Sequence, residues 1–180
     1  MTANISTAAA VNVTRAVTLD GQNHKLSFSN VGQAANLVVS GSGATVKNLT
    51  VENTGDTSTW NSTYCVQFYN GTYNISNLKA TGGNAGIIVN GATATIGENV
   101  DVSGNSFGGI EVSKGTAEGL GAAQLTVNSA ITNTTEAYGQ PTVWTDGADA
   151  TVIDNTGMIA TTEVKDGQTQ YYIVASNATQ

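Results

Sequence analysis

A loose repeat of short apolar strands runs along most of this 180-residue chain and constrains its fold more than any other feature. Strands that end in a glycine turn alternate with strands that carry two spaced apolar residues. The second series recurs at steps of 23, 29, 22, 25 and 25 residues, starting at Leu26, Leu49, Leu78, Val100, Leu125 and Ala150. Repeats of this length with period-two strands and no helical segment predict an all-β solenoid of about six to seven coils. A single coil buries almost nothing, so only stacked coils form an apolar column.

The alternation within each strand predicts which side chains point inward. In the glycine-ended series these are Leu37/Val39, Val66/Phe68, Ile87/Val89, Ile110/Val112 and Val143. In the second series they are Leu49/Val51, Leu78/Ala80, Val100/Val102, Leu125/Val127 and Ala150/Val152, with Leu26/Phe28 as an earlier copy. The variable steps predict protruding loops at residues 55–63 and 114–121. If Asn48, Asn77 and Asn99 align, an inward ladder of hydrogen-bonded amides is expected along one turn.

The composition excludes several classes of function. Charged residues make up only 11% of the chain, the formal net charge is −7 and Arg15 is the only arginine, so no basic surface for nucleic acid or anionic lipid is expected. No apolar run is long enough to span a membrane, and the first residues lack the features of a signal peptide. We therefore expect an extracellular segment of a longer surface protein with neighbouring domains, exported and anchored through parts outside this sequence. Residues 1–180 are predicted to form one domain, with 1–16 as an N-terminal cap and 158–180 as a closing coil.

Several stretches resemble a known family. AVTLDGQNHKLSF is similar to the opening coil of secreted right-handed parallel β-helix proteins. GATVKNLTVEN and GIIVNGATATIGENVDVSGNSFGGIEVS resemble coils of pectate-lyase-like β-helix domains in surface proteins of Gram-positive bacteria, and QPTVWTDGADATVI with GQTQYYIV resembles their closing segment. The resemblance implies a right-handed parallel β-helix at the cell surface. The calcium-binding carboxylates and catalytic base of pectate lyases do not carry over, because Arg15 stands apart from any acidic cluster.

Three aromatic residues are candidates for ligand binding. Trp60 lies in a polar loop, with Tyr64 shortly after it, and flat aromatic faces surrounded by Asn and Thr suit the stacking of sugar rings. The alternative is that Trp60 folds back to cover a gap in the wall. Trp144 should point opposite to Val143, so it is exposed if Val143 is inward and belongs to the core if the register is shifted.

Two further groups of residues have a chemical and a structural interpretation. Asp146 and Asp149 in the turn DGAD supply oxygen ligands for calcium, or else form an ordinary solvated turn. Cys65 is the only cysteine, and as a small apolar residue in a strand it is expected to be buried and unreactive. Beyond this candidate calcium ion, no cofactor is expected.

These observations favour a non-enzymatic adhesin or display module that binds surface glycans or host proteins. A dedicated carbohydrate-binding module with Trp60, Tyr64 and Trp144 as its platform is a closely related hypothesis. The alternative from another class is a carbohydrate-active fragment, either a polysaccharide lyase or hydrolase or a tailspike-like domain. An enzyme would need at least two carboxylates close together on successive coils.

Overall fold

The computed structural model describes residues 1–32 and 35–173, and in these residues almost all regular structure is β-strand, arranged in two sheets. The nine-stranded sheet contains β1 (Ile5–Thr7), β3 (Thr18–Phe28), β5 (Thr45–Asn53), β7 (Thr72–Thr81), β9 (Thr93–Ile96), β10 (Val100–Asp101), β12 (Ala123–Val127), β13 (Ile131–Thr132) and β15 (Ala150–Asp154). The eight-stranded sheet contains β2 (Val11–Val13), β4 (Ala35–Val39), β6 (Tyr64–Tyr69), β8 (Ala85–Asn90), β11 (Gly108–Ser113), β14 (Val143–Asp146), β16 (Thr161–Lys165) and β17 (Gln168–Tyr172). A short 3₁₀ helix, η1, spans Thr134–Tyr138.

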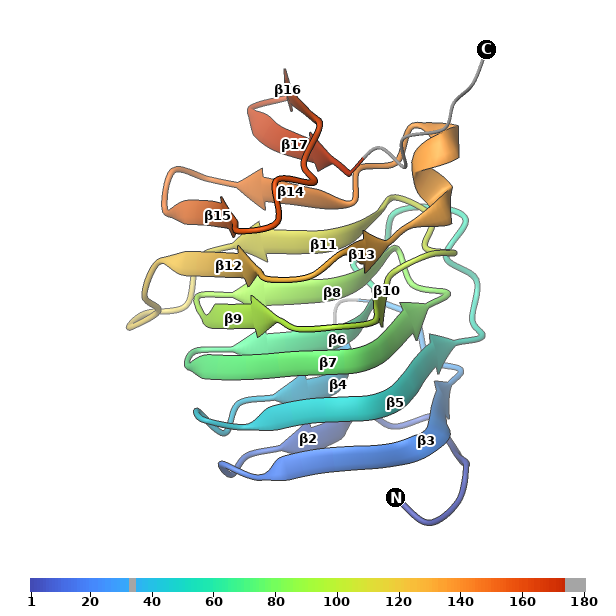
Figure 1. Ribbon diagram of the computed structural model, residues 1–180. Helices are drawn as coiled ribbons and strands as arrows, with labels where there is room; N and C mark the ends of the chain where they lie inside the picture. The colour runs from blue at the N-terminus through green and yellow to red at the C-terminus, as the bar shows by residue number, and fades with distance from the viewer. Residues whose placement is uncertain (33–34, 174–180) are drawn as a thin grey trace.

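The chain crosses from one sheet to the other again and again. The main order of the nine-stranded sheet is β1-β3-β5-β7-β9-β12-β15, and that of the eight-stranded sheet is β2-β4-β6-β8-β11-β14-β17-β16. Each strand therefore pairs with the equivalent strand of the next repeat. These pairs are parallel, and the strands lie one above another from the N-terminus upward (Figure 1). The last hairpin, β16–β17, is antiparallel and also pairs antiparallel with β14. The predicted all-β class with parallel sheets is therefore confirmed.

The core lies between the two sheets. Leu37, Val66, Ile87, Ile110 and Val143 occupy one register position in the eight-stranded sheet and are all fully buried. The predicted inward pairs of the nine-stranded sheet are buried as well, except Ala150 and Val152, which are partly buried near the end of the stack. The period-two pattern thus identified the core face correctly.

The alignment of repeats predicted for the nine-stranded sheet is wrong in two places. Leu26 pairs with Val51 rather than Leu49, a slip of two residues. Leu125 pairs with Ala94 of β9, whereas Val100 pairs with Ile131. The second error is a shift of six residues. Both errors preserve the inward face, because a shift by an even number of residues keeps every side chain on the same side of a strand.

A row of asparagines bends this sheet. Asn48, Asn77 and Asn99 have positive φ angles of 53°, 48° and 56°, a conformation that asparagine tolerates better than most residues. The Asn99 side chain donates to Oδ1 of Asn77 over 2.8 Å, whereas Asn48 donates to Oδ1 of Asp20 over 3.1 Å. These side chains are half-buried or exposed, so the predicted ladder is partial and lies at an outer corner rather than inside.

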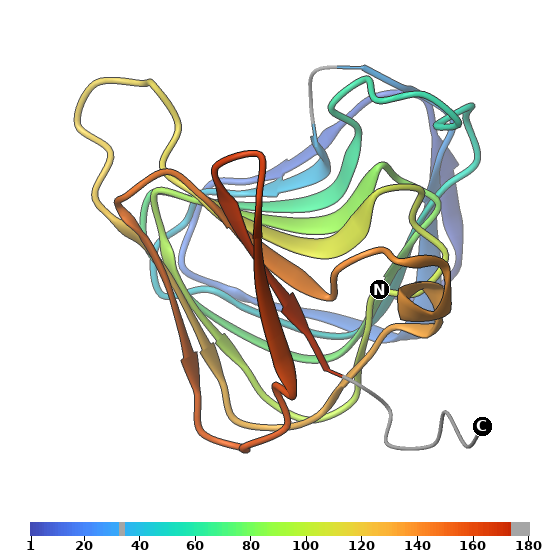
Figure 2. The same cartoon turned by 90° about the horizontal axis from the view of Figure 1, so that it is seen from above.

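Two loops project where they were predicted. Residues 54–63 precede β6 and residues 114–122 follow β11, so the loops leave opposite ends of the eight-stranded sheet and extend beyond the stack (Figure 2). The expected closing coil, 158–180, contains the β16–β17 hairpin, and its residues 174–180 lie outside the described residues. Within the described ranges, no helix has the length and apolar character needed to cross a membrane.

Candidate functional site

The outer face of the eight-stranded sheet carries an unusual row of side chains. Val38, Gln67, Ile88, Glu111 and Trp144 occupy one register position on successive strands. Ala35, Tyr64, Ala85, Ile88 and Trp144 form a second buried apolar cluster, separate from the main core, against which Val38 packs. An outer face of this kind is normally solvated, so its burial shows that loops and the last hairpin cover it.

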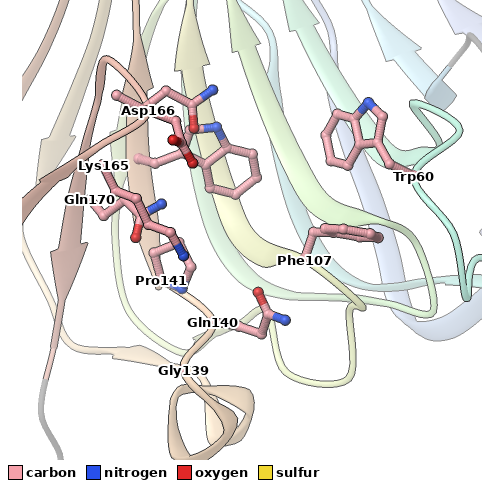
Figure 3. A pocket seen from close by; sticks show the side chains of 10 residues that line it. Trp60, Phe107, Gly139, Gln140, Pro141, Lys165, Asp166 and Gln170 are labelled. Atoms are coloured by element: carbon pink, nitrogen blue, oxygen red, sulfur yellow. The ribbon is translucent and has the colours of Figure 1, made fainter.

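A cavity of about 310 Å³ lies over this face. Trp60 and Phe107 are on one side of it, and Lys165, Asp166 and Gln170 of the hairpin are on the other, with Gln140 between them at the front (Figure 3). Trp144 also lines it, from β14. Gly108 leaves room for this ring, since a Cβ atom there would lie 2.6 Å from Cζ3 of Trp144. The volume is at the lower end of the range for small-molecule sites.

Trp60 is the more exposed of two exposed aromatic residues at the site, with 46% of its surface accessible against 37% for Phe107. Its ring meets Phe107 edge to face, with centroids 5.3 Å apart, and Tyr64 in the same manner at 6.1 Å. Such pairs stabilise one ring orientation beyond simple burial. Trp60 therefore presents a fixed apolar face at the cavity and does not fold back into the wall.

A single buried asparagine holds the Trp60 loop. Asn84 is fully buried at the start of β8. Its Nδ2 donates to the carbonyl oxygens of Thr57 (3.0 Å) and Thr59 (2.9 Å) and to Oγ of Ser106 (3.1 Å). Its Oδ1 accepts from the backbone N–H groups of Asn61 (2.9 Å) and Thr63 (3.0 Å). The loop is thus fixed on both sides of Trp60.

Tyr64 lies beneath Trp60 and is paired with a buried acid. Its hydroxyl donates to Oε2 of Glu111 over 2.6 Å, and Tyr64 and Glu111 are only 9% and 7% exposed. Burial raises the pKa of the Glu111 carboxyl group, and Asp146 raises it further, while hydrogen bonds from Tyr64 and Ser113 act in the opposite direction. Burial and Glu111 also raise the pKa of the Tyr64 hydroxyl, so Tyr64 remains a hydrogen-bond donor.

The predicted calcium residues lie apart from the cavity. Asp146 and Asp149 flank the turn after β14 and are exposed, and Asp149 forms an ion pair with Lys114 of the facing loop at 3.1 Å. In residues 1–32 and 35–173, no group of three or more His, Cys, Asp or Glu side chains is arranged to hold a metal ion. Calcium binding at this turn stays a prediction.

Cys65 is fully buried in the main core, where its Sγ donates to the carbonyl oxygen of Thr81 over 3.1 Å. Burial raises the pKa of its thiol to about 12, so the reactive thiolate is suppressed at neutral pH. This environment suits the structural role expected for Cys65.

Trp60, Tyr64 and Trp144 were proposed as one binding platform, and the structure brings them together. Trp144 is nevertheless buried although Val143 points inward, so the expectation that it would then be exposed is wrong. Sequence reasoning missed Phe107, Asn84 and the hairpin residues Gln168 and Gln170 that complete the site. The hairpin has a recognisable signal: Asp166-Gly167 between two strands, both at positive φ, is typical of a two-residue turn. Asn84 has no such signal, because its partners are Ser106 and backbone groups of a loop more than 20 residues earlier in the sequence.

In comparisons with known proteins, no family model matches the chain, and no curated protein or solved structure matches it significantly. The geometry of the cavity is therefore the basis on which a function is proposed.

Proposed function

We propose that this chain is a right-handed parallel β-helix that serves as a non-enzymatic display module at the cell surface and binds glycans in the cavity beside Trp60. The alternation between two sheets with parallel pairing supports the β-helix. Parallel crossovers of this type are almost always right-handed. An experimental structure with left-handed crossovers, or with antiparallel neighbours through the middle of the stack, would contradict this assignment.

The presentation of Trp60 is the observation that carries the binding function. Sugar rings expose CH groups on one face, and a flat aromatic ring covers them while nearby amides bond the hydroxyls. Trp60 combines large exposure with a fixed loop, so little conformational entropy is lost when a ligand binds. A mobile Trp in a loose loop would lack this advantage.

A surface location agrees with the low proportion of charged residues and with the stacked, extended arrangement of the strands. In this proposal the module is part of a longer polypeptide, and neighbouring domains supply its export and its anchoring. The proposed ligands are surface glycans, and these include the glycans of host glycoproteins, which are also built of sugar rings.

The test is a glycan-array screen of the purified chain, repeated with calcium and with a chelator. We expect saturable binding to a defined glycan set and at least a tenfold weaker affinity for Trp60→Ala, because a buried aromatic face is worth about 1.5–3 kcal/mol. Ile153→Ala is the matched control, since Ile153 is 42% exposed on the other sheet. Loss of binding in chelator would assign the Asp146/Asp149 turn to calcium. Equal affinity of wild type and Trp60→Ala, or binding to no glycan, would refute the proposal.

A carbohydrate-active function is the second candidate, because two carboxylates meet on adjacent strands. Glu111 pairs with Trp144, and Asp146 lies two residues further along the same strand and face. Inverting glycosidases use two carboxyl groups about 6.5–9.5 Å apart, and residues placed diagonally on adjacent strands can reach such a separation. Neither carboxylate lines the cavity, which favours binding without cleavage. Release of reducing ends from a polysaccharide, abolished by Glu111→Gln, would establish the enzyme instead.

A further inference from the structure

The last hairpin gives the cavity a polar wall with a particular chemistry. Gln168 and Gln170 of β17, together with Gln140, supply three side-chain amides among the residues that line it. An amide both donates and accepts hydrogen bonds, as a sugar hydroxyl does. This polar wall faces the apolar side of the cavity that Trp60 and Phe107 form.

One of these amides is already oriented. The Tyr172 hydroxyl donates to Oε1 of Gln170 over 2.8 Å. The carbonyl end of the Gln170 side chain is therefore engaged by the protein, and its amide hydrogens are left to donate to a ligand oxygen. Gln170 also pairs with Trp144 across β14 and β17, which places the amide beside the aromatic floor.

The charges around the cavity discriminate between classes of sugar. Lys165 and Asp166 line it together, and their opposite charges offset one another. The formal net charge of the whole chain is −7. Bidentate recognition of a carboxylate ligand requires arginine, and the only arginine, Arg15, lies between β2 and β3 at the other end of the stack.

We propose that the β16–β17 hairpin is the specificity element of the site and selects uncharged oligosaccharides, with one ring on Trp60 and its hydroxyl groups on Gln168 and Gln170. This inference rests on the proposed glycan-binding function and adds the class of ligand. It excludes polyuronates, because Asp166 already offsets Lys165, the lysine that lines the cavity, and no arginine lines the cavity to bind a uronate carboxylate.

Isothermal titration with two sets of probes tests the inference. The neutral set contains gluco-, manno-, xylo- and galacto-oligosaccharides, and the anionic set contains oligogalacturonates. We expect saturable binding of at least one neutral probe and no binding of oligogalacturonate. Gln168→Ala with Gln170→Ala should weaken the neutral ligand about tenfold, since each lost hydrogen bond is worth about 0.5–1.5 kcal/mol. Gln124→Ala, on the outer face of the other sheet, is the matched control.

The outcomes separate the two proposals. Preferred binding of oligogalacturonate would overturn the ligand class and leave glycan binding intact. An unchanged affinity for the neutral oligosaccharide in the Gln168→Ala/Gln170→Ala double variant would overturn the role of the hairpin. If no probe binds and the glycan array is also blank, the proposed function fails and the inference falls with it.

Discussion

Replacing Asn84 is the most informative perturbation, because this one buried side chain at the start of β8 holds the loop that presents Trp60. Asn84→Ala removes the two amide hydrogens of Nδ2, which three acceptors within 3.1 Å share, and the oxygen Oδ1, which accepts two hydrogen bonds. The bonds are not equal in value. The Thr57 carbonyl oxygen keeps a second donor, Oγ of Ser106 at 2.6 Å, and groups at the loop surface can turn to water.

The bond to Thr63 dominates the expected cost. Thr63 is fully buried, so its N–H group loses its acceptor where solvent does not reach. An unsatisfied buried donor costs about 1–3 kcal/mol, and each of the remaining bonds contributes about 0.5–1.5 kcal/mol at most. We therefore expect Asn84→Ala to lower the free energy of unfolding by about 3 kcal/mol. For a domain of this size this corresponds to a Tm lower by roughly 6–12 °C.

The assay combines thermal unfolding with limited proteolysis of residues 55–62. Asn84→Asp is a variant of equal size that keeps the acceptor oxygen but places a second oxygen against the carbonyl groups of Thr57 and Thr59. Comparison with Asn84→Ala therefore distinguishes the loss of the donated hydrogen bonds from the loss of side-chain volume. Asn74→Ala, at an exposed position in β7, is the control. A change below about 0.5 kcal/mol in Asn84→Ala, with no faster cleavage of the loop, would refute the idea that this residue fixes Trp60.

Two further predictions concern other parts of the structure. The pKa of Glu111 is raised in the folded state, so ionisation of this carboxyl group opposes folding. Its unfavourable contribution to the free energy of folding is absent below the ordinary pKa of 4.5 and grows as the pH rises through the folded value. Chemical denaturation of wild type and Glu111→Gln between about pH 4 and 8 should show the variant gaining stability relative to wild type as pH rises, and parallel pH profiles would contradict this. Asn77→Leu should lower the free energy of unfolding by about 2 kcal/mol, because leucine is strained at positive φ and the bond from Asn99 is lost. Asn74→Leu, in extended backbone, should cost much less in the same melting experiment, and an equal Tm for Asn77→Leu and wild type would count against the corner ladder.

The period-two pattern was sufficient to predict the β class and the inward face of most strands, but not the register. The distances between apolar pairs are compatible with several alignments that differ by two residues, and burial does not discriminate between them. The correct alignment is marked by a row of asparagines, Asn48, Asn77 and Asn99, because the positive φ of each one marks the bend at the same place in successive repeats. Aligned on these three residues, Leu49, Leu78 and Val100 fall into one column, as the pairing of β5, β7 and β10 shows.

The candidate site was only partly accessible from sequence. Trp60 and Tyr64 were found because aromatic residues in a polar loop are conspicuous, and Trp144 because it alternates with Val143. The burial of Trp144 was not predicted, because the Asp166-Gly167 signal marks a hairpin but does not show that β17 pairs beside β14. The Tyr64–Glu111 pair joins residues 47 positions apart, and only the stacking of β6, β8 and β11 brings them together.

The antiparallel hairpin and the Trp60 loop face one another across a cavity, although they belong to different levels of the stack. Strands β8, β11 and β14 lie between β6 and β17 in the sheet order. One additional repeat inserted there would move the two walls apart by about 4.8 Å, and one repeat fewer would bring them together by the same amount. A repeat array that acts only as a spacer tolerates gain or loss of a repeat, whereas here the number of repeats between the two walls fixes the width of the cavity.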